Sequence, residues 1–306
     1  MARYKRTILG TCCVPWNDDG TLMESTFRES IRGMIAKGIP DLYIFGTAGE
    51  GYAVTESQFD RITNIFVEEM RAGSAEPMVG ALSLSLPVII ERIERAARMG
   101  VRQFQISLPA WGALSDKELE VFFQEVCGRF PELQFLHYNL PRTKRVVMPK
   151  EYALLAAKHP NLVATKCAIG EVSMIAGLLQ YAGDLRHFFT EQNFAAGSLL
   201  GECGFLISIA SINPRLARQY FEAGVARDGD VLRTMRNDLM GMHTEMINAA
   251  GSTPFIDGAY DKIFSRIHFK EFPLRLLPPY QYVSDAAFEQ FCAALREKYP
   301  AWLALS

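Results

Sequence analysis

The chain has no excess of charge of either sign and no long hydrophobic run. Its 306 residues include 32 Lys and Arg against 34 Asp and Glu, a formal charge of -2 at pH 7. Electrostatics therefore gives no reason to expect binding to nucleic acid or to an anionic membrane surface. No stretch reaches the roughly 18 continuous apolar residues of a membrane helix, and residues 1–6 lack the apolar run of a signal peptide. These absences predict a cytoplasmic protein that acts on a small molecule.

Paired cysteines and several familiar catalytic signatures are also missing. The six cysteines form no CxxC pair, and the five histidines show no HExxH or other ligand spacing. The sequence therefore predicts reduced cysteines in the core and no metal site. No GxGxxG fingerprint follows the first apolar run, which argues against dinucleotide binding, and the GxSxG elbow of serine hydrolases is absent.

Apolar residues make up 49% of the chain, and from residue 8 to about 210 they form short runs that alternate with segments of helical period. Strands are predicted at residues 8–14, 41–45, 78–82, 103–107, 134–138, 162–167, 187–190 and 205–211. Helices are predicted between them at 22–37, 56–71, 85–99, 116–129, from 149, 171–181 and 194–200, with Thr55 and Ser115 as N-caps. This order favours an α/β fold, a (β/α)8 TIM barrel, over a doubly wound open sheet.

The pattern changes beyond Gly224, where helices without strands are predicted at about 228–248, 257–267 and 285–302. We expect the barrel to occupy residues 1–227 and to carry the active site. Residues 228–306 are expected to form a C-terminal helical appendage that is too small and too closely tied to the barrel to be an independent domain.

Lys166 stands out because it lies in the sixth predicted strand, within the mostly apolar run 162–168. Burial lowers the pKa of an amine, and a lysine that is partly neutral near pH 7 is a nucleophile that forms a Schiff base with a carbonyl carbon. The alternative is a lysine at the strand end whose stem packs while its ammonium reaches water.

Two more features fall at the carboxyl ends of predicted strands, the face that carries the active site in barrels. The loop 46–51 after the second strand contains Thr47 between glycines, so its N–H groups could converge on a carboxylate, although a plain tight turn explains it equally well. Tyr138 ends the fifth strand and could move protons at a carbinolamine, although an ordinary core tyrosine is the alternative. The three features carry weight because they fall on one face.

The motifs together resemble the dihydrodipicolinate synthase and N-acetylneuraminate lyase family of pyruvate-dependent class I aldolases. The resemblance covers about the first 225 residues. Its motifs are Pro15-Trp-Asn-Asp-Asp-Gly20, Gly46-Thr-Ala-Gly-Glu50, Tyr138-Asn-Leu-Pro141, Thr165-Lys166 and the glycines at 201 and 204. It implies that Lys166 forms an imine with pyruvate or another 2-oxo acid, that Thr47 and the amide of Ala48 bind its carboxylate, and that Tyr138 is the acid and base.

The resemblance has further implications for ligands and assembly. It implies that no metal and no cofactor is needed, because the covalent imine at Lys166 serves as the electron sink. It also implies a homo-oligomer, commonly a tetramer built from two dimers. Gly46, Gly49 and Leu206 are expected at the substrate-binding site with the residues already named.

Three positions depart from the family pattern or fit it poorly. Ala48 stands where the family usually has a second hydroxyl, and Trp111 stands where the synthases place a tyrosine that is lent across a dimer contact. An indole has no hydroxyl to relay a proton. Arg142 is one residue out of register with a substrate-binding arginine of the synthases, and a basic loop is the alternative for this segment.

These departures predict a Schiff-base lyase or aldolase that is not a standard lysine-pathway enzyme. The expected partner of the 2-oxo acid is an aldehyde or a sugar acid. A hydratase-aldolase, a sugar-acid aldolase or dehydratase, and dihydrodipicolinate synthase itself stay open, in that order of preference. A barrel that binds a 2-oxo acid but has lost turnover is the alternative of another class. Glu191, Gln192 and Asn193 follow the seventh strand and could either meet substrate hydroxyls or order the loop.

Overall fold

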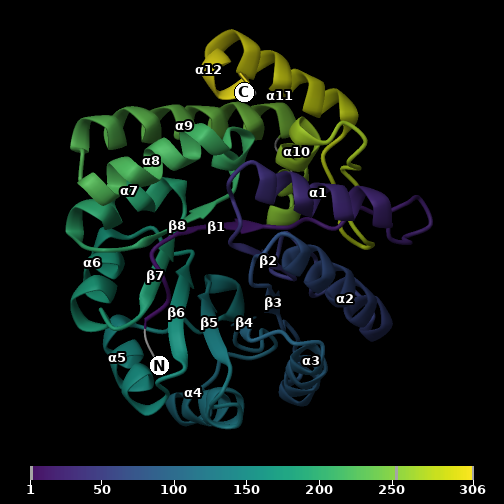
Figure 1. The fold of residues 1–306 in the computed structure, drawn as a ribbon. Coiled ribbons are helices and arrows are strands. Elements are labelled where there is room, and N and C mark those ends of the chain that lie inside the picture. Colours follow the sequence, from purple (N-terminus) through teal and green to yellow (C-terminus); the bar gives the residue numbers. More distant parts are fainter. Residues whose placement is uncertain (1–2, 252–253, 305–306) are drawn as a thin grey trace.

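The computed structural model describes residues 3–251 and 254–304, and its centre is a closed barrel of eight parallel strands (Figure 1). The strands are β1 (Ile8–Thr11), β2 (Leu42–Ile44), β3 (Met78–Gly80), β4 (Gln103–Ile106), β5 (Gln134–Asn139), β6 (Leu162–Cys167), β7 (Arg186–Phe189) and β8 (Gly204–Ile207). Each strand pairs in parallel with the next, and β8 pairs with β1. The predicted (β/α)8 barrel is confirmed.

Helices follow the strands and surround the barrel (Figure 1). They are α1 (Glu24–Ala36), α2 (Glu56–Ala72), α3 (Leu86–Arg98), α4 (Asp116–Phe123), α5 (Pro149–Lys158), α6 (Val172–Tyr181), α7 (Glu191–Leu200) and α8 (Pro214–Ala226). The predicted N-caps are confirmed. Thr55 accepts a hydrogen bond from the Gln58 amide, and Ser115 accepts one from the Glu118 amide.

Some elements differ from the sequence prediction. The first strand ends at Thr11 rather than Val14, and residues 12–14 stay buried beyond its end. No range was predicted for the helix α8, although Asn213 caps it and Pro214 occupies its first turn, a combination that favours a helix start. The segment predicted as one helix over 116–129 leaves the α-helical pattern after Phe123 and continues as a short π-helix over Gln124–Gly128.

The C-terminal helices are α9 (Gly229–Ala250), α10 (Asp257–His268), α11 (Asp285–Lys298) and α12 (Pro300–Leu303). Pro300 divides the last predicted helix, because proline cannot donate the amide hydrogen bond that would continue it. In Figure 1 α9 lies beside α7 and α8, with α11 and α12 outside it. The helix α10 packs against the loops that follow β8 and β2, and it thereby covers part of the barrel's carboxyl end.

Two apolar layers hold the barrel. One fills its interior, and the other lies between the strands and the helices. The interior cluster is formed by Tyr4, Leu9, Tyr43, Met78, Leu136, Val163, Ala164, Phe188 and Leu206. Tyr4 donates a backbone hydrogen bond to Val163, near the start of β6, so this cluster closes the amino end of the barrel.

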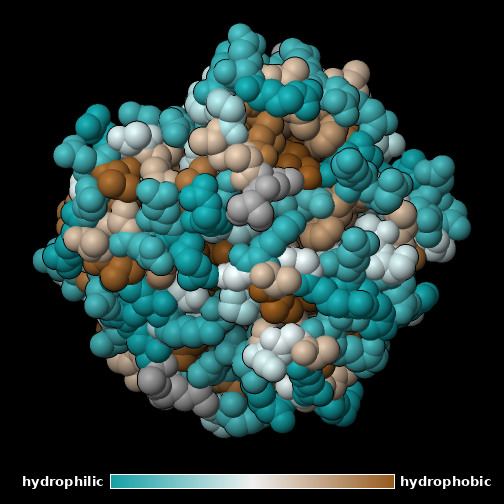
Figure 2. Space-filling model, turned by 45° about the horizontal axis from the view of Figure 1, so that its top comes forward, coloured by the Kyte–Doolittle hydropathy of each residue, from teal (hydrophilic) through white to brown (hydrophobic). Residues whose placement is uncertain are grey.

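The outer surface is mixed in character. Figure 2 shows one face that is mostly hydrophilic, with several separate hydrophobic patches. All six cysteines lie within the described residues, and they are buried and unpaired. Among the helices of the described chain, none is both long enough and apolar enough to cross a membrane.

Candidate active site

Lys166 and Tyr138 lie side by side on neighbouring strands. Tyr138 of β5 and Lys166 of β6 are register partners, so both side chains project to the same face of the sheet. The Lys166 Nζ lies 3.8 Å from the centroid of the Tyr138 ring, which is within the range of cation–π attraction. Lys166 is only 7% exposed and Tyr138 only 5%. The lysine therefore does not extend its ammonium into bulk water.

A second phenol, which sequence reasoning missed, also contacts this ammonium. The Lys166 Nζ donates a hydrogen bond of 2.9 Å to the hydroxyl of Tyr43 on β2. Burial pulls the pKa of the Lys166 ammonium down, but Tyr138, Tyr43 and Asp261 outweigh burial and hold that pKa above the ordinary lysine value. The expectation that burial leaves this amine partly neutral is therefore wrong. The resting amine carries a proton that it must lose before it can act as a nucleophile.

The loop that follows β2 takes a conformation that depends on its glycines. Phe45 has a φ of 61° and Glu50 a φ of 55°, values that side chains other than glycine rarely adopt. A Cβ at Gly49 would lie 2.6 Å from the Phe45 nitrogen, and a Cβ at Gly46 would lie 2.7 Å from the Tyr43 ring. Only glycine fits these two positions, so the backbone of the loop packs closely against the second strand.

Glu50 anchors this loop to the C-terminal part of the chain. Its carboxylate accepts hydrogen bonds from Trp16 Nε1 at 2.8 Å and from the Leu277 amide at 2.7 Å, and it pairs with Lys262 of α10 at 2.7 Å. The side chains of Glu50 and Lys262 are both fully buried. Lys262 is thus a second buried lysine, but its ammonium is held by a carboxylate and is no candidate nucleophile.

Thr47 and Arg142 meet at the entrance of the site. Arg142 donates a hydrogen bond of 3.3 Å to the Thr47 hydroxyl and forms a 3.4 Å ion pair with Asp257 of α10. A cavity of about 460 Å³ opens here, and Thr47, Tyr138 and Arg142 are among the residues that line it. Lys166 is not among them, because its ammonium rests against the ring of Tyr138. The structure thus brings Tyr138, Thr47 and Arg142 together at this cavity, and Lys166 adjoins it through its contact with the ring of Tyr138.

The other predicted site residues take different places. Ala48 is buried beside Cys13 and Phe272, and Leu206 belongs to the interior cluster of the barrel. Trp111 is 83% exposed and is not among the residues that line the 460 Å³ cavity of its own chain. Within one chain, Trp111 therefore does not form a wall of this cavity. A role for Trp111 in an assembled oligomer stays a prediction.

Two buried carboxyl groups lie near the loop after β8. The Glu191 carboxylate accepts hydrogen bonds from the amides of Ser208 and Ala210, so it orders that loop, which was the second interpretation of this residue. Asp261 of α10 accepts a hydrogen bond from the Ser208 hydroxyl, and burial raises its pKa to about 7. Sequence reasoning missed Asp261, because nothing in the periodicity of α10 marks this residue apart from its other polar positions.

These groups define what the site can do chemically. An amine, two phenols, a hydroxyl and a guanidinium surround one end of the barrel, a set suited to a small molecule with a carbonyl and a carboxylate. Within residues 3–251 and 254–304, no three His, Cys, Asp or Glu side chains are placed to hold a metal ion.

The sequence matches known proteins over most of its length. Residues 5–258 match the model of the dihydrodipicolinate synthetase family. A 4-hydroxy-tetrahydrodipicolinate synthase from Exiguobacterium sibiricum is 25% identical over 262 residues, which are 85% of this chain and 88% of that protein.

Solved structures show the same fold at low sequence identity. A prophage protein of the dihydrodipicolinic acid synthase family from E. coli K12, in complex with pyruvate, superposes with a TM-score of 0.84 at 18% identity, over 98% of this chain and 99% of that one. A catalytic lysine mutant of a Ruminococcus gnavus sialic acid aldolase gives a TM-score of 0.77 at 17% identity, over 95% and 96% of the two chains.

Proposed function

Because the chain belongs to the dihydrodipicolinate synthetase family of lyases and aldolases, we propose that it binds a 2-oxo acid such as pyruvate as an imine on Lys166. The observation that carries the proposal is the buried Lys166 amine, which contacts the Tyr138 ring and the Tyr43 hydroxyl at the carboxyl end of a barrel. In this family the imine makes the adjacent carbon acidic, so a bond at that carbon can be made or broken.

The first step is the release of the amine from its resting contacts. The hydrogen bond to Tyr43 and the cation–π contact with Tyr138 both favour the charged form of Lys166. Loss of the proton weakens both contacts, and the neutral amine is then free to turn toward the 460 Å³ cavity and attack the ketone carbon. In the resting state these two contacts therefore keep Lys166 protonated, and a protonated amine is not a nucleophile.

The substrate carboxylate needs donors near Lys166, and the loop after β2 offers them. Thr47 supplies a hydroxyl, and the amide of Ala48 follows it in the tightly packed loop. Arg142 reaches the Thr47 hydroxyl, so its guanidinium can add a charge-assisted hydrogen bond to the same carboxylate or to a second one. Tyr138 lines the cavity and moves the proton at the carbinolamine and at the reacting carbon.

The second substrate is an aldehyde or a sugar acid in this proposal. Ala48 and Trp111 remove two hydroxyls that a standard dihydrodipicolinate synthase uses, so a hydratase-aldolase or a sugar-acid aldolase is preferred over that synthase. The protein works in the cytoplasm as a homo-oligomer, in which a second copy can cover the exposed Trp111. Trp111 would then close the cavity of its partner.

Trapping of the imine tests this function. Incubation with pyruvate and borohydride should add one reduced pyruvyl group, and peptide mapping should place it on Lys166. Lys262 serves as an internal control, since it is also buried but paired with Glu50, and it should stay unmodified. An unmodified Lys166 across a panel of 2-oxo acids would refute the proposal.

A panel of aldehydes and sugar acids, assayed for pyruvate release, then identifies the reaction. Turnover that disappears in Lys166→Ala would dispose of the alternative in which the barrel only binds a 2-oxo acid. Imine formation without turnover of any member of the panel would favour that alternative, for which Ala48 and Trp111 are the supporting observations.

A further inference from the structure

We propose that Asp261 receives, by way of Tyr43, Thr11 and a water molecule, the proton that the Lys166 ammonium loses before it attacks the 2-oxo acid. This inference rests on the proposed function. It gives a role to a buried carboxyl group on α10 and to an inward-facing hydroxyl on β1, neither of which takes part in the steps described above.

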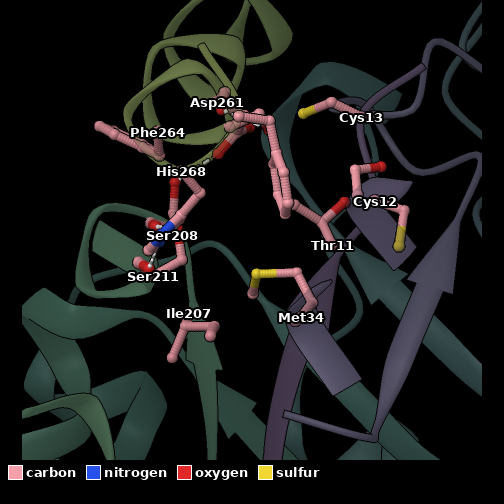
Figure 3. A pocket seen from close by; sticks show the side chains of 14 residues that line it. Thr11, Cys12, Cys13, Met34, Ile207, Ser208, Ser211, Asp261, Phe264 and His268 are labelled. Carbon is pink, nitrogen blue, oxygen red and sulfur yellow. Dashed lines mark hydrogen bonds between the residues drawn. The ribbon is translucent and has the colours of Figure 1, made fainter. Parts of the chain in front are cut away.

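The first observation is a small cavity between α10 and β1, shown in Figure 3. Its volume is about 30 Å³, and Thr11, Ser208 and Asp261 are among the residues that line it. One buried water needs roughly 10–15 Å³ and two to four polar partners. The cavity offers that room, and it offers two hydroxyls and a carboxyl group as partners.

The second observation is the position of Thr11. Thr11 on β1 is the register partner of Tyr43 on β2, so the two side chains project to the same face of the sheet. The Thr11 hydroxyl is buried and has no hydrogen-bond partner among the described residues. Burial raises the pKa of the Tyr43 phenol, and the Thr11 hydroxyl is among the neighbouring groups that counteract this rise. A buried, unpaired hydroxyl thus stands between the phenol and the cavity.

The third observation is the environment of the Asp261 carboxyl group. Ser208 donates its hydroxyl hydrogen to Oδ1 of Asp261, which leaves Oδ2 to accept a proton from the cavity. The groups that face Asp261 are Asp257 on the preceding turn of α10, Glu191 on α7, Lys166 on β6 and Cys13 after β1. Asp257 and Glu191 disfavour the Asp261 carboxylate, whereas the Lys166 charge favours it.

Among the titratable side chains in and around the small cavity, Asp261 is the one whose pKa lies near neutrality, at about 7. His268 also lines the cavity, but burial lowers its pKa to about 4, so it is neutral at pH 7. Burial raises the pKa values of the Cys12 and Cys13 thiols, which therefore stay protonated. Lys262 is paired with Glu50.

The proton transfer balances without any further reactant. The Lys166 N–H bond breaks as its proton moves to the Tyr43 oxygen, and the Tyr43 proton moves to Thr11. The Thr11 proton moves to the water, and the water protonates Asp261. An ammonium and a carboxylate become a neutral amine and a neutral carboxyl group. The two ends are coupled, because a neutral Lys166 no longer stabilises the Asp261 carboxylate.

The test follows imine formation with pyruvate by rapid quenching with borohydride and intact mass, over about four pH units around neutrality. The wild-type rate should rise as the pH passes about 7, where Asp261 becomes able to accept a proton. Asp261→Asn should lower the rate about 100-fold and remove that rise. The control Ser265→Ala, one turn further along α10 and on the same cavity, should change neither.

Thr11→Val supplies a second test that does not depend on the folding of Asp261→Asn. Valine keeps the shape of the side chain but removes the hydroxyl. Because no described residue pairs with the Thr11 hydroxyl, this variant should keep its fold, losing at most the hydrogen bonds of the relay itself, and yet form the imine more slowly. Wild-type rates and an unchanged pH profile in both variants would overturn this inference alone. A wild-type protein that forms no imine would overturn the proposed function with it.

Discussion

Tyr138 and Tyr43 contact the same ammonium in different ways, and this assigns them different roles. Tyr138 offers the face of its ring, with the Lys166 Nζ at 3.8 Å from the centroid, and it lines the 460 Å³ cavity. Tyr43 offers its hydroxyl at 2.9 Å and belongs to the interior cluster of the barrel. The first phenol is therefore placed toward substrate, and the second is placed toward the resting amine.

Tyr138→Phe separates these roles, since phenylalanine keeps the ring and its contact with the ammonium. Turnover should fall by about 100-fold to 10,000-fold, the usual contribution of a positioned acid or base. The pyruvate imine should still be trapped in the variant, although it should form more slowly because Tyr138 also moves the proton at the carbinolamine. Steady-state kinetics and borohydride trapping on the same preparation measure the two effects.

Tyr220→Phe provides the matched control for this prediction. Tyr220 is buried, and its hydroxyl donates to the Glu191 carbonyl rather than to any group of the proposed site. The control should keep the wild-type turnover and lose only some stability. Equal turnover in Tyr138→Phe and the wild type would remove Tyr138 from the proposed acid–base role.

At the scale of elements, apolar runs and turn residues predicted most of the barrel. The strand around Lys166 and the loop 46–51 were found because an apolar run with one lysine and a Gly-Thr-Ala-Gly turn leave visible marks in the sequence. Tyr43 and Asp261 were missed for a physical reason. Tyr43 is 123 residues from Lys166, and only barrel closure shows that both side chains point inward. The contact between Asp261 and Ser208 likewise depends on where α10 packs.

The buried ion pair between Glu50, in the loop after β2, and Lys262 of α10 leads to a prediction about stability. Lys262→Met should lower the free energy of unfolding by about 3–5 kcal/mol, because it leaves the buried Glu50 carboxylate without a cation. The loop that carries Thr47 should loosen as well, so the trapping of pyruvate should weaken. Chemical denaturation and the concentration of pyruvate needed for trapping measure the two losses.

The surface pair of Lys298 and Glu245 tests whether burial is the cause. These residues lie 2.7 Å apart, like Glu50 and Lys262, but the Lys298 side chain is half exposed. Lys298→Met should therefore cost about 1 kcal/mol or less. A similar loss of unfolding free energy in both variants would show that the buried pair of Glu50 and Lys262 contributes no more to stability than an ordinary surface ion pair.

At the scale of the whole molecule, buried titratable groups make the free energy of unfolding depend on pH in two opposite directions. Burial lowers the pKa of His137 to about 3 and the pKa values of His187 and His268 to about 4. The unfolded chain binds more protons at these histidines between about pH 4 and 6.5, so their contribution to stability is lost as the pH falls through that range. Asp261 acts in the other direction.

The Asp261 carboxyl group keeps its proton in the folded state up to a pKa of about 7, whereas its ordinary value is 3.8. Between these values the folded state binds more protons than the unfolded chain, so this group lowers the free energy of unfolding as the pH rises, with the full effect above pH 7. At about 1.4 kcal/mol for each unit, the cost reaches about 4 kcal/mol.

Asp261→Asn should therefore match the wild type in stability near pH 4 and exceed it increasingly up to about pH 7. The difference between the two unfolding free energies, measured by denaturant titration at a series of pH values, isolates Asp261 from the histidines because the histidines are common to both proteins. If the variant is more stable and yet forms the imine more slowly, the Asp261 carboxyl group lowers stability while it speeds the reaction. A residue with a purely structural role would not combine these two effects. A difference that does not change with pH would mean that Asp261 titrates at its ordinary value and cannot hold the proton of Lys166 near neutrality.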